Sequence, residues 1–441
     1  MALSARQIVS SGDIERLLGG QYVDPDGGEL LAVATRSVVI ANSLAGMEGE
    51  LVAALGIGRR LAVVSDATTH QVLGARVVQA LRAMASVQDL VLPEHPHADA
   101  HTAAELRTTT RACDALIAVG AGTINDLCKV VAAEDGKPYA VFGTAPSMNG
   151  YTSTSAAITV DGHKRSLPAR APAGVFLDLR ILTRAPPRMI RSGLGDSLCR
   201  STAQADWLLA RLLREEPYRE VPFVLLAQDE EALLGEPEAL LGGDLEAMRC
   251  LARTLVLSGF GMAICGGSYP ASQGEHLISH YADMMGDRAW PESFHGEQIG
   301  VTTLTMARLQ AQLLDQDRPP RLGEGPHEAD VVGHFGGSLG RSCWREFCAK
   351  RSSAAQRALL NERLEQQWPQ MRRRIAAVMV PAAKLEAALE RAGAATTPQE
   401  IHWPRDFYQN AVRHAREIRD RYTFLDLAGD GDRLERFVRS L

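Results

Sequence analysis

GAGTINDLCK occupies residues 120–129 and decides the fold that we predict for this chain. An apolar run at residues 115–119 precedes it, and its length and bounding glycine are typical of a buried parallel strand. A helical pattern continues through Leu127, Val130 and Val131. Glycines in such a turn let backbone N–H groups approach a phosphate, and the following helix N-terminus adds about half a positive charge. A nucleotide pyrophosphate site and an ordinary tight turn are both compatible with this segment.

Short apolar runs alternate with helical patterns on both sides of this stretch, from residue 29 to about residue 178. Strands are expected at residues 30–34, 38–41, 61–65, 90–92, 115–119, 139–142 and 175–177, and helices at residues 51–55, 72–85 and 103–112. A polar, hairpin-like excursion is expected at residues 161–165. This alternation predicts a mostly parallel sheet with helices on both faces. Ligands of such sheets bind outside the carboxyl ends of the strands, where Asp66, Gly120 and Thr144 fall.

The pattern becomes helical after residues 185–187. Helices are expected at residues 194–212, 230–241, 247–265, 276–285, 300–313, 354–367, 371–392 and 406–421. Residues 316–338 are rich in Gly, Pro and charge, and we expect a surface connection there. Since 441 residues exceed one comfortable core, we predict an α/β domain at residues 1–187 and an all-α domain at residues 188–441.

Composition restricts the possible partners and compartment. A hydrophobic content of 46% and a charged content of 23% are typical of a soluble globular protein. The formal net charge of -6, without a dense Lys/Arg cluster, gives no reason to expect nucleic acid binding. Seven scattered cysteines without a C-x-x-C pair argue against a disulfide framework and a cysteine zinc site. Neither a signal peptide nor a membrane span is indicated, so a cytoplasmic location is expected.

Three histidines and one aspartate could bind a metal ion. His276 and His280 are four residues apart, so on a helix both imidazoles project from one face. His295 follows a helix break expected at Pro291 and can fold back toward that face. Asp196, in SGLGD at residues 192–196, is the candidate carboxylate. Such a set suits zinc or ferrous iron. Packed or solvated histidines and a helix-capping aspartate are the ordinary alternatives.

TAPSMNGYTS, at residues 144–153, directly follows an expected strand. Its hydroxyl groups, beside Pro and Gly, could form a structured turn. They could equally bind a ribose, a nicotinamide amide or a substrate hydroxyl.

Together these segments resemble the sn-glycerol-1-phosphate dehydrogenase branch of the iron-containing alcohol dehydrogenase and dehydroquinate synthase-like superfamily. The resemblance runs from about residue 60 to residue 305. Five motifs match in order and at compatible spacing: GAGTINDLCK, TAPSMNGYTS, SGLGD, SYPASQGEHLISH and FHGEQIG. The resemblance implies a dehydroquinate synthase-like fold, with an NAD-binding α/β domain followed by an all-α domain that binds metal and substrate.

The resemblance also implies roles for individual residues. The dinucleotide site would comprise Asp66, Gly120, Ala121, Gly122, Thr123, Ile124, Thr144, Ala145, Pro146, Ser147 and Ser153. Asp66 resembles the acid that binds the adenosine ribose, which favours NAD, with NADP possible. Asp196, His276 and His295 match the metal ligands. Zinc is expected, and Fe2+ or Ni2+ less so, because Arg200 stands where some relatives have a further histidine. The catalytic set would be His280, Asn149 and Asp196.

Three positions depart from the family pattern. Ala121 stands in the middle of a loop that is commonly Gly-Gly-Gly, and Gln273 stands where a glycine is usual. Asn149 replaces an Asp that typically hydrogen-bonds the substrate. An asparagine still accepts through its carbonyl oxygen, but it carries no charge and adds two donors. The exact substrate is therefore left open.

The implied activity is reversible hydride transfer between NAD(H) and a small phosphorylated polyol or ketone, namely sn-glycerol 1-phosphate and dihydroxyacetone phosphate of phospholipid metabolism. Lys129, Lys164, Arg165 and Arg200 are candidate phosphate contacts. A homodimer or larger assembly is implied by the resemblance. Dehydrogenases of another polyol phosphate or phosphonate, sugar-phosphate cyclases of the same superfamily, and a non-catalytic binding protein remain as alternatives.

Overall fold

The computed structural model of the chain describes residues 12–160, 163–287 and 289–441. The chain folds into two compact units. The first unit consists of Met1–Ser197 and Glu220–Ser268, and the second consists of Leu198–Arg219 and Tyr269–Leu441. The chain therefore enters the second unit once, returns to the first, and leaves it again.

A six-stranded sheet forms the centre of the first unit, in the order β3-β10-β7-β6-β4-β5, and all of its pairs are parallel. Its strands are β3 (Ser37–Ala41), β4 (Arg60–Asp66), β5 (Ser86–Leu92), β6 (Ala115–Gly120), β7 (Tyr139–Gly143) and β10 (Gly174–Asp178). The predicted parallel sheet is confirmed. The strand expected at residues 30–34 is shorter, because β2 (Leu30–Leu31) pairs only with β1 (Tyr22–Val23) in an antiparallel hairpin.

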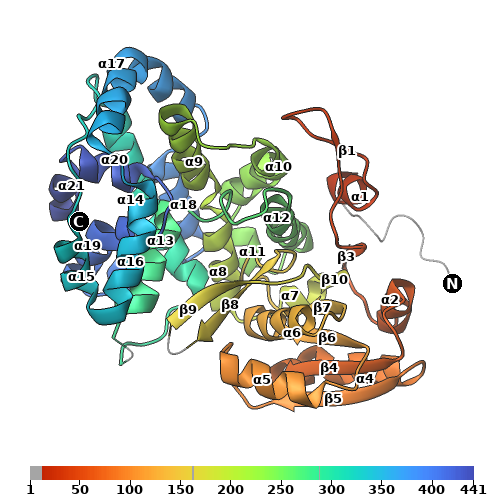
Figure 1. The fold of residues 1–441 in the computed structure, drawn as a ribbon. Helices are drawn as coiled ribbons and strands as arrows, with labels where there is room; N and C mark the ends of the chain where they lie inside the picture. The colour runs from red at the N-terminus through yellow and green to blue at the C-terminus, as the bar shows by residue number, and fades with distance from the viewer. Residues whose placement is uncertain (1–11, 161–162, 288) are drawn as a thin grey trace. The chain divides into compact units, whose positions relative to one another are not determined.

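Helices cover both faces of this sheet (Figure 1). The helices of the first 197 residues are α1 (Gly12–Leu18), α2 (Glu48–Leu55), α3 (Ala67–Thr69), the π-helix η1 (His70–Gly74), α4 (Ala75–Arg82), α5 (Ala100–Thr109), α6 (Gly122–Glu134), α7 (Leu179–Leu182) and α8 (Pro187–Ser197). α2 and α4 pack their apolar side chains with Leu61, Ile117 and Phe176 on one face. On the other face Tyr139 Oη of β7 donates to Asn125 Oδ1 of α6 at 3.4 Å.

A second antiparallel pair, β8 (Ser155–Val160) and β9 (His163–Pro168), follows β7. Asp126 of α6 fixes its start, because the N–H of Ala157 donates to Asp126 Oδ2 at 3.0 Å. This pair corresponds to the expected excursion, of which residues 161 and 162 lie outside the described residues.

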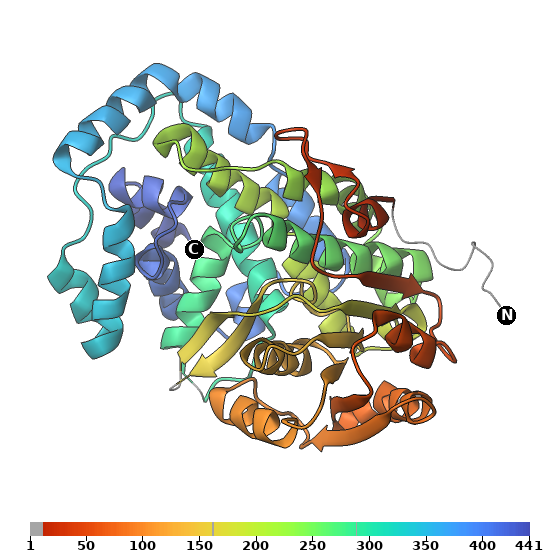
Figure 2. The same cartoon turned by 45° about the vertical axis from the view of Figure 1, so that its right-hand side comes forward.

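Residues 220–268 add α10 (Val221–Gly235), α11 (Glu238–Leu241) and α12 (Leu245–Ile264) to the first unit. Arg249 of α12 donates to the backbone oxygen of Ile40 at 3.1 Å. The N–H of Glu220 donates to Asp26 at 2.8 Å, and both views show the N-terminal hairpin beside α10 (Figures 1 and 2). These two units group residues by their contacts, and they differ from the division that we expected between residues 187 and 188. That division concerned functional domains, and it stays a prediction.

α12 is the one described helix that is long and apolar enough, by length and composition, to cross a membrane. Its most apolar window has a mean hydropathy of 1.3 and is 72% buried inside the fold. A buried core helix of a folded protein meets the same criteria of length and composition.

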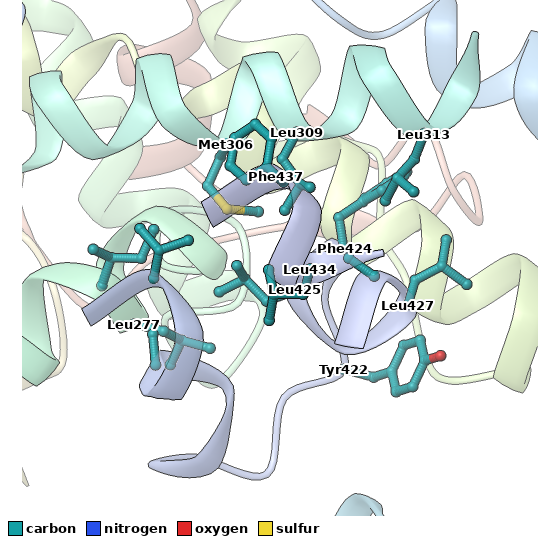
Figure 3. Packing of buried hydrophobic residues seen from close by; sticks show 14 of the residues in the cluster. Leu277, Met306, Leu309, Leu313, Tyr422, Phe424, Leu425, Leu427, Leu434 and Phe437 are labelled. Atoms are coloured by element: carbon teal, nitrogen blue, oxygen red, sulfur yellow. The ribbon is translucent and has the colours of Figure 1, made fainter. Parts of the chain in front are cut away.

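The second unit is helical throughout its described residues. Its helices are α9 (Arg200–Arg214), α13 (Gly274–Met285), α14 (His295–Leu314), α15 (Glu328–Phe335), α16 (Gly337–Lys350), α17 (Ala354–Ala376), α18 (Ala382–Arg391), α19 (Arg405–His414), α20 (Phe424–Asp430) and α21 (Leu434–Ser440), with short 3-10 turns at Pro398–Ile401 and Ala415–Glu417. In Figure 3, Met306 and Leu309 of α14 point toward Phe437 of α21 in the core of this unit.

Three helical expectations are corrected. The helix expected at residues 194–212 is two helices, α8 and α9, which separate where the chain passes into the second unit. α15 lies within residues 316–338, where we expected only a connection. α17 continues through Pro369, whereas the expected helix ended at residue 367. Its residues Leu364, Trp368, Met371 and Ile375, on both sides of Pro369, are buried in the core of the second unit.

Candidate active site

The glycine turn lies between β6 and α6, as predicted. β6 ends at Gly120, Ala121 precedes α6, and no side chain caps the first turn of this helix. Its first N–H groups are therefore available to an anion. A Cβ atom at Gly120 would approach Ile124 Cβ to 2.7 Å, whereas one at Gly122 would only touch Met148 at 3.5 Å. Packing against Ile124 therefore requires a glycine at residue 120.

Asp66 ends β4, next to β6 in the sheet, and Thr144 follows β7 on the other side of β6. The three candidate cofactor positions after these parallel strands therefore share one edge of the sheet. Asp66 also caps α3, since its Oδ1 accepts from the N–H of Thr69 at 2.7 Å. A carboxylate has about four acceptor positions, so this cap leaves capacity for a ribose hydroxyl.

Residues 144–153 form a loop that is hydrogen-bonded within itself and to α12. Thr144, Ala145 and Ser153, three of its candidate cofactor residues, are buried. Tyr151 Oη donates to the backbone oxygen of Ala145 at 2.7 Å. Thr152 Oγ1 donates to the backbone oxygen of Val256 in α12 at 2.7 Å.

Lys129 of α6 stabilises the same loop through hydrogen bonds from its ammonium group. Its ammonium donates to Gly150 O at 2.6 Å, to Ser153 Oγ at 2.9 Å and to Ser155 O at 3.0 Å. Burial lowers the pKa of this fully buried lysine. Its three protons are used by two acceptors of the loop and one at the start of β8, so Lys129 holds the loop instead of reaching a substrate phosphate.

Two glycines let helices approach this loop at backbone contact distance. A Cβ atom at Gly193 of α8 would overlap the carbonyl oxygen of Pro146, and one at Gly259 of α12 would overlap Thr152 Oγ1. Ser192 adds a hydrogen bond from its Oγ to Ser147 O at 3.1 Å. Gly193 of SGLGD therefore serves packing against the loop, and sequence analysis missed Gly259, which is distant from the motifs.

Asn149 and Asp196 come together within the first unit. The N–H of Asn149 donates to Asp196 Oδ2 at 2.9 Å. Asp196 is 1% exposed and lies in the last turn of α8, so it is neither a helix cap nor a first-turn acid. A buried carboxylate at this end of a helix is disfavoured by the helix dipole and calls for a nearby cation.

His276, His280 and His295 come together within the second unit. His276 lies in the first turn of α13, and the ring of His280, one turn later, lies 6.2 Å from it between centroids. His295 begins α14, and its ring centroid lies 5.1 Å from that of His276. The prediction that His295 folds back toward the α13 histidines is confirmed.

Buried polar groups surround the start of α13. Gln273 precedes the helix with a φ of -131°, which any residue adopts, so a glycine is not needed there. Asp206 of α9 accepts from the N–H groups of Gly274 and Phe424, each at 2.9 Å. Burial and the neighbouring Glu275 carboxylate raise the pKa of Asp206 to about 8. Nothing in the sequence of α9 distinguishes Asp206 from an ordinary helix residue.

The other candidate phosphate contacts differ in their surroundings. Arg200 Nη1 donates to Gln204 Oε1 at 2.7 Å in α9 of the second unit. Arg165 is exposed on β9 of the first unit. The side chain of Lys164 lies outside the described part of the chain.

Known proteins resemble this chain in sequence. A family model described as iron-containing alcohol dehydrogenase matches residues 39–186. A glycerol-1-phosphate dehydrogenase [NAD(P)+] of Bacillus velezensis is 30% identical over 66% of this chain and 78% of that protein. Its counterpart in Methanospirillum hungatei is 27% identical over 96% of this chain and 98% of that protein. One from Halalkalibacterium halodurans is 34% identical over 56% of this chain and 64% of that protein.

The parallel sheet, the glycine turn and the helical second unit are those of an iron-containing alcohol dehydrogenase. Within that superfamily, the chain belongs to the glycerol-1-phosphate dehydrogenase branch.

Solved structures share the fold. A glycerol dehydrogenase from Schizosaccharomyces pombe superimposes with a TM-score of 0.60 at 14% identity, over 92% of this chain and 90% of that chain. A sulfoacetaldehyde reductase from Bifidobacterium kashiwanohense, in complex with NAD+, superimposes with a TM-score of 0.60 at 14% identity, over 93% of this chain and 97% of that chain. At this identity the likeness concerns the fold alone.

Proposed function

We propose that this protein is a metal-dependent, NAD(P)-linked dehydrogenase that interconverts dihydroxyacetone phosphate and sn-glycerol 1-phosphate. The observation that carries the proposal is the similarity to a glycerol-1-phosphate dehydrogenase along nearly the whole of both chains. In the oxidative direction, the hydrogen on C2 leaves as a hydride to the nicotinamide and the hydroxyl proton is released. The products are dihydroxyacetone phosphate, the reduced cofactor and one proton.

The dinucleotide would bind at the carboxyl edge of the sheet. The uncapped N-terminus of α6 would hold the pyrophosphate through Gly122 and Thr123 N–H groups, which is the usual use of a helix after a glycine turn. The buried loop at residues 144–153 would hold the nicotinamide side. Asp66 would accept from the adenosine ribose, so we propose NAD as the preferred cofactor and NADP as a second one.

Asp196, His276 and His295 would hold the metal ion, which we propose to be zinc in preference to Fe2+ or Ni2+. The donor set fits, because two neighbouring imidazoles and one carboxylate are typical zinc ligands. When bound, such an ion supplies Lewis acidity that stabilises negative charge on the substrate oxygen, by several kcal/mol. His280, one helical turn from His276, would exchange the hydroxyl proton or contact the substrate.

Asn149 would contact a substrate hydroxyl with its side chain, while its backbone N–H orients Asp196. Because an amide carries no charge, this contact is the position at which another polyol phosphate or a phosphonate could be preferred. Lys164, Arg165 and Arg200 remain the candidate contacts for the phosphate. We further propose that the protein is cytoplasmic and forms a homo-oligomer. Light scattering on the purified protein would test the oligomeric state.

The test is NADH oxidation by the zinc-loaded protein with dihydroxyacetone phosphate, dihydroxyacetone and glyceraldehyde 3-phosphate, supplied separately. We expect turnover with the first, and sn-glycerol 1-phosphate as the product in chiral analysis. Absence of turnover with dihydroxyacetone phosphate would reject the proposed substrate. Consumption of a sugar phosphate without any net change in NADH would favour a cyclase instead.

A further inference from the structure

Glu275 precedes His276 in the first turn of α13, and both side chains are buried. His276 Nδ1 lies 2.9 Å from Glu275 Oε1. Glu275 is 0% exposed and His276 is 5% exposed, so water does not compete for this hydrogen bond. None of the family motifs assigns a role to Glu275.

The carboxylate of Glu275 is held by neighbours on both sides. Its Oε1 also accepts from the N–H of Gln273 at 2.8 Å. Its Oε2 lies 3.3 Å from Thr202 Oγ1 of α9. Because the N–H of Gln273 can only donate, Oε1 of Glu275 is an acceptor, and it faces the imidazole of His276.

This contact determines which nitrogen of His276 can bind a metal. A carboxylate only accepts hydrogen bonds, so Nδ1 of His276 must carry the proton and Nε2 must present its lone pair. We propose that Glu275 is a positioning residue that fixes His276 in the Nδ1–H tautomer and directs Nε2 toward the divalent metal ion. The proposal rests on His276 being a metal ligand, as in the proposed function.

Glu275 could instead be a ligand itself, because Cys199, Glu275 and His276 place their ligand atoms within 4.8 Å of one another. The hydrogen bonds argue against that set. A metal ion bound to Glu275 Oε1 would displace both donors from this oxygen, and Cys199 Sγ is already directed at Ala271 O at 3.7 Å. A carboxylate that accepts a hydrogen bond from the second ring nitrogen of a metal-ligating histidine is also a recurrent arrangement, and it strengthens metal binding.

The test compares zinc dissociation constants, measured by chelator competition, for Glu275→Leu and a matched control. Leucine is used because glutamine would keep an acceptor for Nδ1–H. Glu417→Leu is the control, because Glu417 is buried in the same unit and binds His414 Nδ1 at 3.0 Å, apart from the proposed ligands. We expect zinc to bind roughly 10- to 100-fold more weakly in Glu275→Leu and to be unchanged in Glu417→Leu. Excess zinc should restore most of the turnover of Glu275→Leu.

Other outcomes separate this proposal from the proposed function. If His276→Ala loses zinc but Glu275→Leu binds it as the wild type does, Glu275 has no positioning role and only this proposal fails. If His276→Ala keeps its zinc, both fail. A thiolate-to-metal charge-transfer band in the cobalt-loaded protein that Cys199→Ser abolishes would make Glu275 a ligand beside Cys199. Nitrogen NMR of the wild-type apoprotein gives a readout without any variant, since an Nε2–H tautomer at His276 overturns the proposal.

Discussion

The backbone N–H of Asn149 binds Oδ2 of Asp196 at 2.9 Å, and the side chain of Asn149 takes no part in this bond. The loop after β7 therefore orients the carboxylate whichever residue stands at position 149. A substitution that removes the side chain of Asn149 should therefore leave the metal ion bound.

Asn149→Ala should keep its zinc and lose activity. The backbone hydrogen bond to Asp196 survives, whereas one substrate hydrogen bond disappears, so kcat/KM for dihydroxyacetone phosphate should fall roughly 10- to 100-fold. Metal analysis and steady-state kinetics on the same preparation check this. Zinc loss in the variant would show that the side chain, and not the backbone, supports Asp196.

Lys129→Met should lower stability and weaken cofactor binding together. Two acceptors of the loop and Ser155 O of β8 lose their buried donor, at a cost of about 2–4 kcal/mol, since such losses are not additive. Thermal unfolding and NADH fluorescence titration measure the two effects. Lys384→Met, at an exposed position of α18, should change neither. Unaltered NADH affinity in Lys129→Met would mean that the loop does not contribute to the cofactor site.

Gly193→Ala should be strongly destabilising, because the added methyl group overlaps the carbonyl oxygen of Pro146 and a backbone must move. Overpacking of this kind costs about 1–3 kcal/mol or more. Gly235→Ala, at the end of α10 with open space around the added carbon, should be neutral or slightly stabilising. Chemical denaturation of the two variants gives the comparison. Equal stability of the two would contradict the close approach of α8 to the loop.

Acid should destabilise the second unit through His334. Its ring stacks on His414 with centroids 3.6 Å apart, and its Nε2 lies 2.9 Å from Tyr281 Oη. Burial, and then the charge of His414, lower the pKa of His334. A histidine with a lowered folded-state pKa binds protons more readily when unfolded, so stability falls as pH drops through its unfolded pKa of about 6.5.

His334→Gln should therefore show a smaller loss of unfolding temperature between pH 7.5 and pH 5.5 than the wild type. Glutamine can still accept from Tyr281 but does not titrate. Parallel thermal melts across this pH range measure the difference. Identical slopes for the two proteins would assign the acid sensitivity to other groups.

Much of the parallel sheet was predictable, because its central strands are uninterrupted apolar runs. β5 was predicted only over its last three residues, since Gln88 and Asp89 interrupt the apolar pattern at this edge of the sheet. α15 was missed because Gly323, Gly325 and Pro326 precede it and suggest a loop.

The candidate site was predictable where its chemistry is local in sequence. The glycine turn and the return of His295 toward His276 follow from motif and spacing. The bond from Thr152 to Val256 joins residues 104 positions apart, and that between Thr202 and Glu275 joins residues 73 apart. Such contacts depend on how the helices fold back, which a pattern of residues in one segment does not contain.

The return of residues 220–268 to the first unit also affects how the chain can be made and divided. During synthesis the sheet cannot complete its packing until α12 has left the ribosome, after the 22 residues of Leu198–Arg219 that belong elsewhere. No single cut separates the two units, so a fragment ending near residue 197 would leave the faces covered by α12 exposed to water. A stable sheet unit would need Glu220–Ser268 joined back through a short linker in place of α9.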